Sequence, residues 1–330
     1  MRHRFGHVRA AEWCYQDQMS STRHVHGDLP APFVREVADD VFAYVQPDGG
    51  WWINNTGFIR GADTTVSIDS CSTERRTRAY LEAVDRVTGG APRVLVNTHH
   101  HGDHTNGNCL LPFATIIGHE RCREEVLRTG IQHYDGLFEP VEWGTLQVAP
   151  PFVTFKERLD VFVGDLKVEL IHLTDAAHTT NDVVAWIPEC RVLFSGDLVF
   201  NGGTPFVVMG SVAGSIEALR LIADLRPAVI VPGHGAPCGI EAALACRSYL
   251  EWLQVTARRG IDAGLTPLEA AREADLAEFG ELLEPERLAG NLHRAYAECA
   301  GADPGEPIDL ASAFADMLTL NGGRPLRCMA

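Results

Sequence analysis

The sequence predicts a mixed α+β fold with an added C-terminal helical segment. Through residue 239, short apolar or alternating runs typical of strands are interspersed with amphipathic helical patterns. Beyond 239 the chain is rich in Ala, Leu, Glu and Arg, with a helical period and no strand pattern. Its 330 residues can bury a large core. We therefore predict an N-terminal arm over 1–31, a main domain over 32–239 and a helical extension over 240–330.

In the first half of the main domain, strand patterns surround one long helical pattern. Residues 34–46 alternate as a strand does, Pro47–Gly50 indicates a turn, and residues 51–59 are expected to form the returning strand. Further along we expect a strand at 64–69, a helix at 72–87, a strand at 93–97, a helical turn at 106–111, a strand at 114–117, a helix at 119–128 and an irregular stretch over 131–151.

The second half repeats this mixture and then becomes helical. Ser215 is a plausible N-cap for a helix over 215–225. The other expected elements are a hairpin at 158–173, strands at 182–187, 191–194 and 228–231, and helices at 240–258, 267–273 and 285–299. The Ala/Leu faces of the last helices need burial, so they are expected to cover one flank of the site or to form a homodimer contact.

Composition narrows the choice of partners and compartment. The net charge of −16, from 44 acidic and 28 basic residues, disfavours a nucleic-acid backbone or an anionic membrane surface as partner. No apolar run is long enough to span a membrane, and the arm carries no secretory signal. Nine cysteines without a Cys-x-x-Cys motif favour reduced thiols, so we expect a cytoplasmic protein. Lys156 and Lys167 are the only lysines, and together with the abundance of Ala, Gly and Val this favours a GC-rich, bacterial genome. The arm's His3, His7, His24 and His26 lack ligand spacing.

A cluster of metal-ligand side chains follows the apolar run at 93–97. His99, His101 and Asp103 are spaced two apart, so an extended backbone points them to one side, and His104 follows as the chain turns. Three imidazoles and a carboxylate suit a borderline metal such as zinc. The alternative is a solvated polar loop that binds no metal. The density of ligand-type side chains in this cluster disfavours that alternative.

The pattern His-x-His-x-Asp-His resembles the signature of the metallo-β-lactamase superfamily. Three further candidate ligands, His178, Asp197 and His234, follow in order near strand-like runs. The resemblance covers roughly residues 33–240. It implies an αββα four-layer sandwich with the metals at the shared edge of the two halves.

The resemblance also implies a ligand set for two Zn²⁺ ions. His99, His101 and His178 would bind the first zinc, and Asp197 would bridge the two, although it is alternatively an ordinary turn aspartate. Asp103, His104 and His234 would bind the second zinc. An aspartate at 197 makes the site similar to that of glyoxalase II-like hydrolases. Iron and manganese are alternatives, because His and Asp ligands accept them too.

The implied chemistry is that of a dinuclear zinc metallohydrolase. A metal-bridging hydroxide would attack an ester or thioester carbonyl, while Asp103 orients it and relays its proton. Asp69 matches a family aspartate that hydrogen-bonds the metal loop, and Thr98 is a further candidate for supporting the ligands. An ordinary turn residue is the alternative for Asp69.

The substrate is expected to be a small molecule with an apolar or aromatic acyl part. Trp51, Trp52, Phe200 and Phe206 are expected to form walls of the groove, or alternatively are plain core or surface aromatics. A β-lactam is disfavoured, because no lysine after Lys167 offers a cationic anchor. Residues 98–108 and 202–214 resemble zinc-dependent thioesterase/cyclases of aromatic polyketide pathways. A lactone or glyoxalase II-like hydrolase and a β-lactamase are the alternatives; a non-enzymatic metal-binding partner protein is the least favoured.

Overall fold

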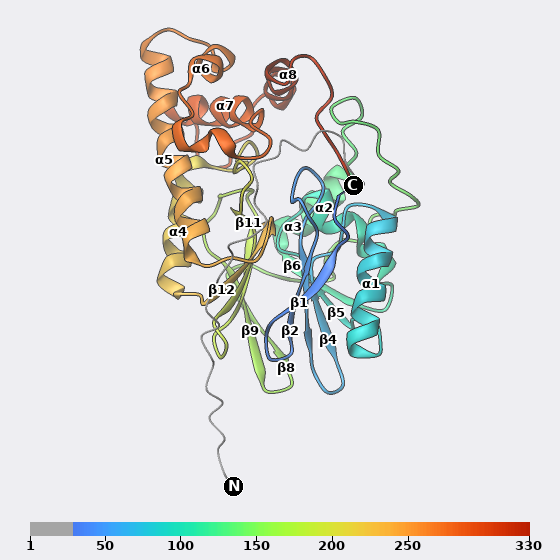
Figure 1. Cartoon of the computed structure of the whole chain (residues 1–330). Coiled ribbons are helices and arrows are strands. Elements are labelled where there is room, and N and C mark those ends of the chain that lie inside the picture. The colour runs from blue at the N-terminus through green and yellow to red at the C-terminus, as the bar shows by residue number, and fades with distance from the viewer. Residues whose placement is uncertain (1–28) are drawn as a thin grey trace.

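The computed structural model describes residues 29–330, which form two face-to-face β-sheets flanked by helices (Figure 1). Most of the predicted N-terminal arm, including its four histidines, lies outside the described residues. The predicted αββα sandwich is confirmed, with α1 beside one sheet and α4 and α5 beside the other. None of the helices in the described part is long and apolar enough to cross a membrane.

The first sheet follows chain order across the described strands. Antiparallel pairing joins the first four strands and parallel pairing joins the last four. Its strands are β1 (Phe33–Ala38), β2 (Val41–Val45), β3 (Thr56–Arg60), β4 (Thr65–Ile68), β5 (Val94–Val96), β6 (Thr115–His119) and β7 (Val153–Phe155). The parallel half places the ends of β4 and β5 side by side, where Asp69 and the histidine cluster follow.

The second sheet has the order β12-β11-β10-β9-β8, and only its β11–β12 pair is parallel. Its strands are β8 (Arg158–Val163), β9 (Leu166–His172), β10 (Val183–Ile187), β11 (Val192–Phe200) and β12 (Val229–His234). Because β11 and β12 run in the same direction, Asp197 and His234 reach the same edge of the sheet.

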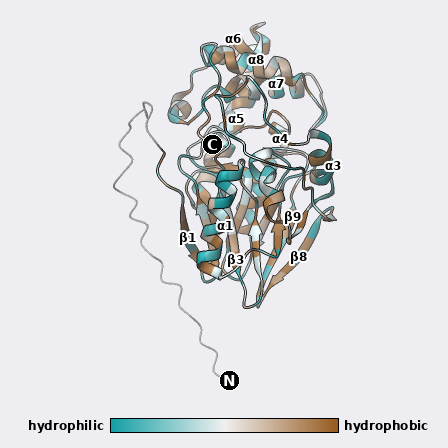
Figure 2. Cartoon of the chain, turned by 90° about the vertical axis from the view of Figure 1, so that its right-hand side faces the viewer, coloured by the Kyte–Doolittle hydropathy of each residue, from teal (hydrophilic) through white to brown (hydrophobic). Residues whose placement is uncertain are grey.

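Alternation along the strands builds two apolar layers. Val41, Ala43 and Val45 on β2 belong to the core shared with the second sheet, as the alternation along residues 34–46 leads one to expect. Phe42 and Tyr44 face the other way and pack with Tyr80 of α1. Figure 2 shows the outward α1 as largely hydrophilic beside hydrophobic strands.

The helices cover the outer faces and then form a C-terminal group on the second half of the sandwich (Figure 1). The helices α5, α7 and α8 share one apolar core with α4 and β11. The helical elements are α1 (Glu74–Thr88), α2 (Gly102–Thr105), η1 (Asn106–Leu110), α3 (Glu120–Thr129), α4 (Val212–Leu225), α5 (Ile240–Asp262), α6 (Pro267–Glu273), η2 (Ala277–Glu281), α7 (Arg287–Cys299) and α8 (Leu310–Leu320).

Several predicted boundaries are wrong for local reasons. Residues 51–55 form a loop rather than a strand, because the Asn55 N–H donates to Gly233 and its side chain to Pro232 on the other sheet. Ser215 is not an N-cap: α4 begins one turn earlier, where the Ser211 side chain accepts from Gly214 N–H. Strand β7 and helix α8 were not predicted.

Candidate metal centre

The seven predicted ligands meet where the two sheets share an edge. His99 and His101 lie in the loop after β5, and Asp103 and His104 lie on the single turn α2. The second sheet supplies the other three: His178 from the β9–β10 loop, Asp197 from β11 and His234 from the end of β12. The two sets of candidate ligands, which are at least 74 positions apart in sequence, therefore converge on one point.

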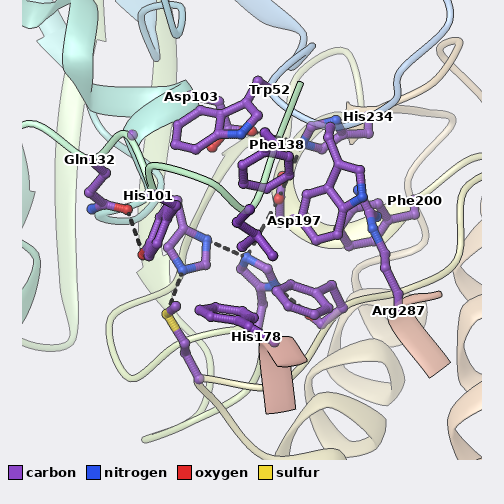
Figure 3. Close-up of a pocket in the computed structure, with 17 residues that line it drawn as sticks. Trp52, His101, Asp103, Gln132, Phe138, His178, Asp197, Phe200, His234 and Arg287 are labelled. Carbon is purple, nitrogen blue, oxygen red and sulfur yellow. Dashed lines mark hydrogen bonds and ion pairs between the residues drawn. The ribbon is translucent and has the colours of Figure 1, made fainter. Parts of the chain in front are cut away.

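His99, His101, His178 and Asp197 form the first of two groups that could hold a metal ion. Nδ1 of His101 lies 2.8 Å from Nε2 of His178, which is 3.5 Å from an Asp197 oxygen (Figure 3). Nε2 of His99 is 4.0 Å from the same oxygen. A tetrahedral zinc with bonds of about 2.0–2.2 Å separates its ligand atoms by roughly 3.4 Å, so these spacings suit one ion.

Asp103, His104, Asp197 and His234 form the second group, in which Asp197 is shared with the first. Nε2 of His234 lies 3.2 Å from an Asp103 oxygen and 3.3 Å from an Asp197 oxygen. Nε2 of His104 lies 3.1 Å from the other Asp197 oxygen. Gly233 permits this approach, because a Cβ there would lie 1.9 Å from the Asp197 carboxylate.

Each imidazole directs one ring nitrogen toward the centre, and its other ring nitrogen contacts a partner outside the ligand groups. Nδ1 of His178 donates to the Phe206 carbonyl, and Nδ1 of His234 donates to the Gly49 carbonyl at 3.1 Å. Nδ1 of His99 lies 3.1 Å from the Thr98 hydroxyl, and Nε2 of His101 lies 3.3 Å from the sulfur of Met209. Such outer partners fix ring orientation in metal sites.

Two imidazole nitrogens that face the centre show whether the site suits a metal ion. Nε2 of His99 and Nε2 of His104 are buried and have no hydrogen-bond partner among the described residues. A buried polar atom without a partner is costly, and one cation bound in each group would satisfy both nitrogens. The donor set of nitrogen and carboxylate oxygen matches a divalent metal such as zinc.

Asp69 and Thr98 hold the ligand loop from behind. The Asp69 carboxylate accepts from the Thr98 backbone N–H at 2.8 Å, from the Thr98 hydroxyl at 2.7 Å and from Nδ1 of His104 at 2.8 Å. Asp69 is buried at the end of β4 in a left-handed backbone conformation, with φ of 60°. It therefore orients His104 directly and His99 through Thr98.

Burial and the crowded charges shift the pKa values at the centre. Burial disfavours ionisation of Asp197, but the imidazoles of His234 and His104 outweigh it and hold its pKa well below the usual range. Burial also disfavours a charged His234, yet the Asp197 carboxylate raises the pKa of His234 to about 9. The pKa of His99 is lowered by burial and by neighbouring imidazoles. The carboxylates are thus ready to bind a cation.

A cavity lined largely by aromatic side chains, here called the aromatic cavity, opens onto both ligand groups (Figure 3). His101, His178, Asp103, Asp197 and His234 lie at its base. The four residues predicted as substrate walls all line it. Its apolar lining consists of Trp51, Trp52, Tyr134, Leu137, Phe138, Phe200, Phe206, Met209 and Phe314.

Sequence reasoning missed part of this lining. Gln132, Tyr134 and Phe138 lie in the irregular stretch at 131–151, whose aromatic content was the only available signal. Arg287 and Phe314 come from α7 and α8 and carry no motif. Arg287 also corrects the expectation of a cavity without a cation, although its charge is paired with Glu284. His100, between two ligands, is buried against Asn181 and is not exposed.

Comparison with known proteins identifies the class that this fold and site define. Residues 49–234 match the family described as the Metallo-beta-lactamase superfamily. The chain belongs to the metallo-β-lactamase superfamily of hydrolases, as the histidine motif predicted.

Curated relatives are distant and differ in activity. A linear primary-alkylsulfatase from Pseudomonas is 22% identical over 337 residues, covering 82% of this chain and 61% of the relative. The chain thus spans about three fifths of that protein. The acyl-coenzyme A thioesterase MBLAC2 from Bos taurus is 24% identical, covering 59% of this chain and 81% of the relative. A Shewanella baltica hydroxyacylglutathione hydrolase is 30% identical over 44% of this chain and 47% of its own length.

Solved structures agree on the fold alone. The metallo-β-lactamase TMB-1 aligns with a TM-score of 0.55 and 19% identity, over 68% of this chain and 99% of its own. A metallo-β-lactamase from Pontibacter korlensis aligns with a TM-score of 0.56 and 18% identity, over 67% and 99%.

Proposed function

We propose that the protein is a dinuclear zinc hydrolase that cleaves thioesters with a bulky aromatic or polyketide-like acyl chain. The observation that carries this proposal is the placement of the aromatic cavity directly over both ligand groups. Zinc, when bound, would lower the pKa of water to about 7 and polarise the substrate carbonyl.

The chain's own residues have distinct tasks in this proposal. Asp103 lines the aromatic cavity, and its carboxylate would orient the attacking water and accept its proton. Asp197 would hold the two ions together as a shared ligand, because it belongs to both groups. No serine or cysteine nucleophile is needed, and a thiolate leaves with little need for a proton donor.

The cavity walls favour a large apolar acyl group. Trp51 packs against Phe138 and Phe206 with ring centroids 5.3 and 5.0 Å apart, and Trp52 packs against Phe138 at 5.6 Å. Aromatic walls of this kind bind flat apolar groups through dispersion and edge-to-face contacts. The thioesterase name of the MBLAC2 relative supports the same class of bond.

A β-lactam remains disfavoured, for a revised reason. Its carboxylate would need a free cation, and Arg287 is the basic side chain that lines the aromatic cavity. The Arg287 guanidinium is ion-paired with Glu284 and donates to the Thr204 carbonyl at 2.8 Å. Its charge is therefore already compensated within the protein.

The experiment is a substrate panel at equal concentration, with products identified by mass. It compares an aromatic acyl thioester, an acetyl thioester, a simple ester, a lactone, a β-lactam and a long alkyl sulfate. The alkyl sulfate is included because the alkylsulfatase match covers 82% of this chain. We expect the aromatic acyl thioester to be cleaved fastest, and chelator treatment to abolish its cleavage. Preferred turnover of the β-lactam or the sulfate, or indifference to acyl size, would contradict the proposal.

A further inference from the structure

Trp51 has three contacts with the residues that precede and begin α7. Its backbone N–H donates to a Glu284 oxygen, and its indole N–H donates to a Glu286 oxygen at 2.8 Å. The Arg287 guanidinium carbon lies 4.0 Å from the centroid of the Trp51 ring. These contacts join positions more than 230 residues apart.

The same guanidinium also contacts a second aromatic wall of the aromatic cavity. It lies over the Phe200 ring, 5.0 Å from its centroid. Phe200 in turn stacks on the imidazole of His234, with centroids 5.3 Å apart and planes 12° apart. Arg287 therefore connects Trp51 to Phe200, whose ring packs against the candidate metal ligand His234. Figure 3 labels Arg287, Phe200 and His234.

Arg287 is 1% exposed, which is costly for a cation unless it is fully compensated. Glu284, the Thr204 carbonyl and the rings of Trp51 and Phe200 compensate most of that charge. Nε of Arg287 is buried without a hydrogen-bond partner among the described residues. Attachment of α7 itself does not require this arrangement, because Leu288 and Leu292 already bury its apolar face.

We propose that Glu284, Glu286 and Arg287 form a clamp that sets the spacing between Trp51 and Phe200, and so determines selectivity for large acyl groups. These are positioning residues, which act through the two walls. The identity of the acyl group rests on the proposed function; the positioning of the walls does not. The C-terminal helices, rather than the metal-bearing sandwich alone, would then specify the substrate.

The neighbouring tryptophan offers a matched control. The indole N–H of Trp52 is buried without a hydrogen-bond partner among the described residues, and the Trp52 ring packs with Tyr134, Phe138 and Trp143. Trp51→Phe removes the donor to Glu286, whereas Trp52→Phe makes the same change of ring without breaking a hydrogen bond of the clamp. Each is combined with Glu286→Ala in a double-mutant cycle.

Selectivity is measured as the ratio of kcat/KM for an aromatic acyl thioester to that for the acetyl thioester. It is also measured as the ratio of dissociation constants of the matching non-hydrolysable thioethers, by calorimetry, with metal content checked throughout. We expect Trp51→Phe and Glu286→Ala each to reduce both selectivity ratios about tenfold. The double variant should show no larger reduction than either single variant, because both substitutions break the same contact. Glu286→Gln, which keeps an acceptor oxygen, should restore most of the ratio. Trp52→Phe and Glu286→Ala should act independently.

Three results would overturn the clamp. The first is that Trp51→Phe and Glu286→Ala reduce the selectivity ratio independently, so that their effects add in the double variant. The second is that each substitution lowers kcat/KM equally for the aromatic and the acetyl thioester. The third is that the parent protein binds the two thioethers equally well. A parent that binds the aromatic thioether selectively but hydrolyses no thioester would contradict the proposed reaction. The proposed clamp would then be tested by the ratio of dissociation constants of the two thioethers alone.

Discussion

Nδ1 of His104 donates a hydrogen bond to the Asp69 carboxylate at 2.8 Å. The two residues come from different elements, since Asp69 follows β4 and His104 lies on α2. The contact fixes the proton on Nδ1 and leaves Nε2 free to face the centre, where it lies 3.1 Å from Asp197. The edge of the first sheet thereby orients a ligand of the second group.

Replacing Asp69 is expected to weaken metal binding. Outer partners of this type typically contribute ten- to hundredfold in metal affinity, so we expect Asp69→Ala to lose about that factor. Competition with a chromophoric chelator measures it. Asp40→Ala, which breaks an exposed pair with Arg60, serves as the control. Unchanged affinity in Asp69→Ala would show that the hydrogen bond does not orient a ligand.

Removing the shared carboxylate should separate the two ions. We expect elemental analysis at saturating zinc to give two ions per chain for the parent and at most one for Asp197→Ala, because Asp197 belongs to both groups. We expect kcat/KM to fall by at least about a hundredfold, with little loss in thermal stability. Two ions and parent-like turnover in the variant would refute the bridging assignment.

The two groups of candidate ligands could be predicted because their signals are local. His99, His101 and Asp103 alternate after an apolar run, and Asp197 lies on a buried strand. Strand order then brings distant strand ends to one edge, which the family resemblance anticipated. The tautomers could not be predicted, because they depend on long-range partners such as Gly49 for His234.

The substrate side was harder to predict, because it depends on packing between distant segments. Trp51 and Phe206 carried a signal through their aromatic character beside the motif. Arg287 and Phe314 reach the aromatic cavity only because α7 and α8 fold back over the second sheet. A charged residue at the start of a helix ordinarily indicates an exposed position, and nothing local marks Arg287 as buried.

The C-terminal helices are expected to be integral to stability. Leu292 on α7 is fully buried, and Leu292→Ala should lower the free energy of unfolding by about 2–5 kcal/mol through lost contacts and a cavity. Urea denaturation followed by circular dichroism measures it. Leu244→Ala on α5, where the side chain is 38% exposed, should cost far less. Equal effects of the two substitutions would argue against a shared core.

Truncation tests the same interface on a larger scale. A chain ending at 239 would lose α5 to α8 and expose Val199, Phe200 and the apolar face of α4 that they cover. We expect it to self-associate or precipitate, which light scattering detects. A soluble, active truncated chain with the parent's oligomeric state would refute this. The homodimer stays a prediction, which the same measurement on the full chain would check.

His119 should make the protein sensitive to acid. Its Nδ1 accepts the Arg121 N–H at 3.2 Å, which caps α3 and requires a neutral ring. Burial, and then the imidazole of His172 with ring centroids 4.1 Å apart, lower the pKa of His119 from 6.5 to about 4. Between these values the unfolded chain binds a proton that the folded chain does not, so the free energy of unfolding falls as pH falls from 6.5 to 4.

The measurement is urea denaturation of the chelator-treated protein at pH 7, 6 and 5, compared with His119→Asn. Asparagine keeps a capping oxygen but does not titrate, so its stability should depend less on pH. We expect the parent to lose on the order of 1 kcal/mol more than the variant between pH 7 and pH 5. Metal-free protein is used so that release of a bound metal in acid does not contribute to the pH dependence of either chain. Parallel pH profiles for the two proteins would show that His119 is not the residue responsible.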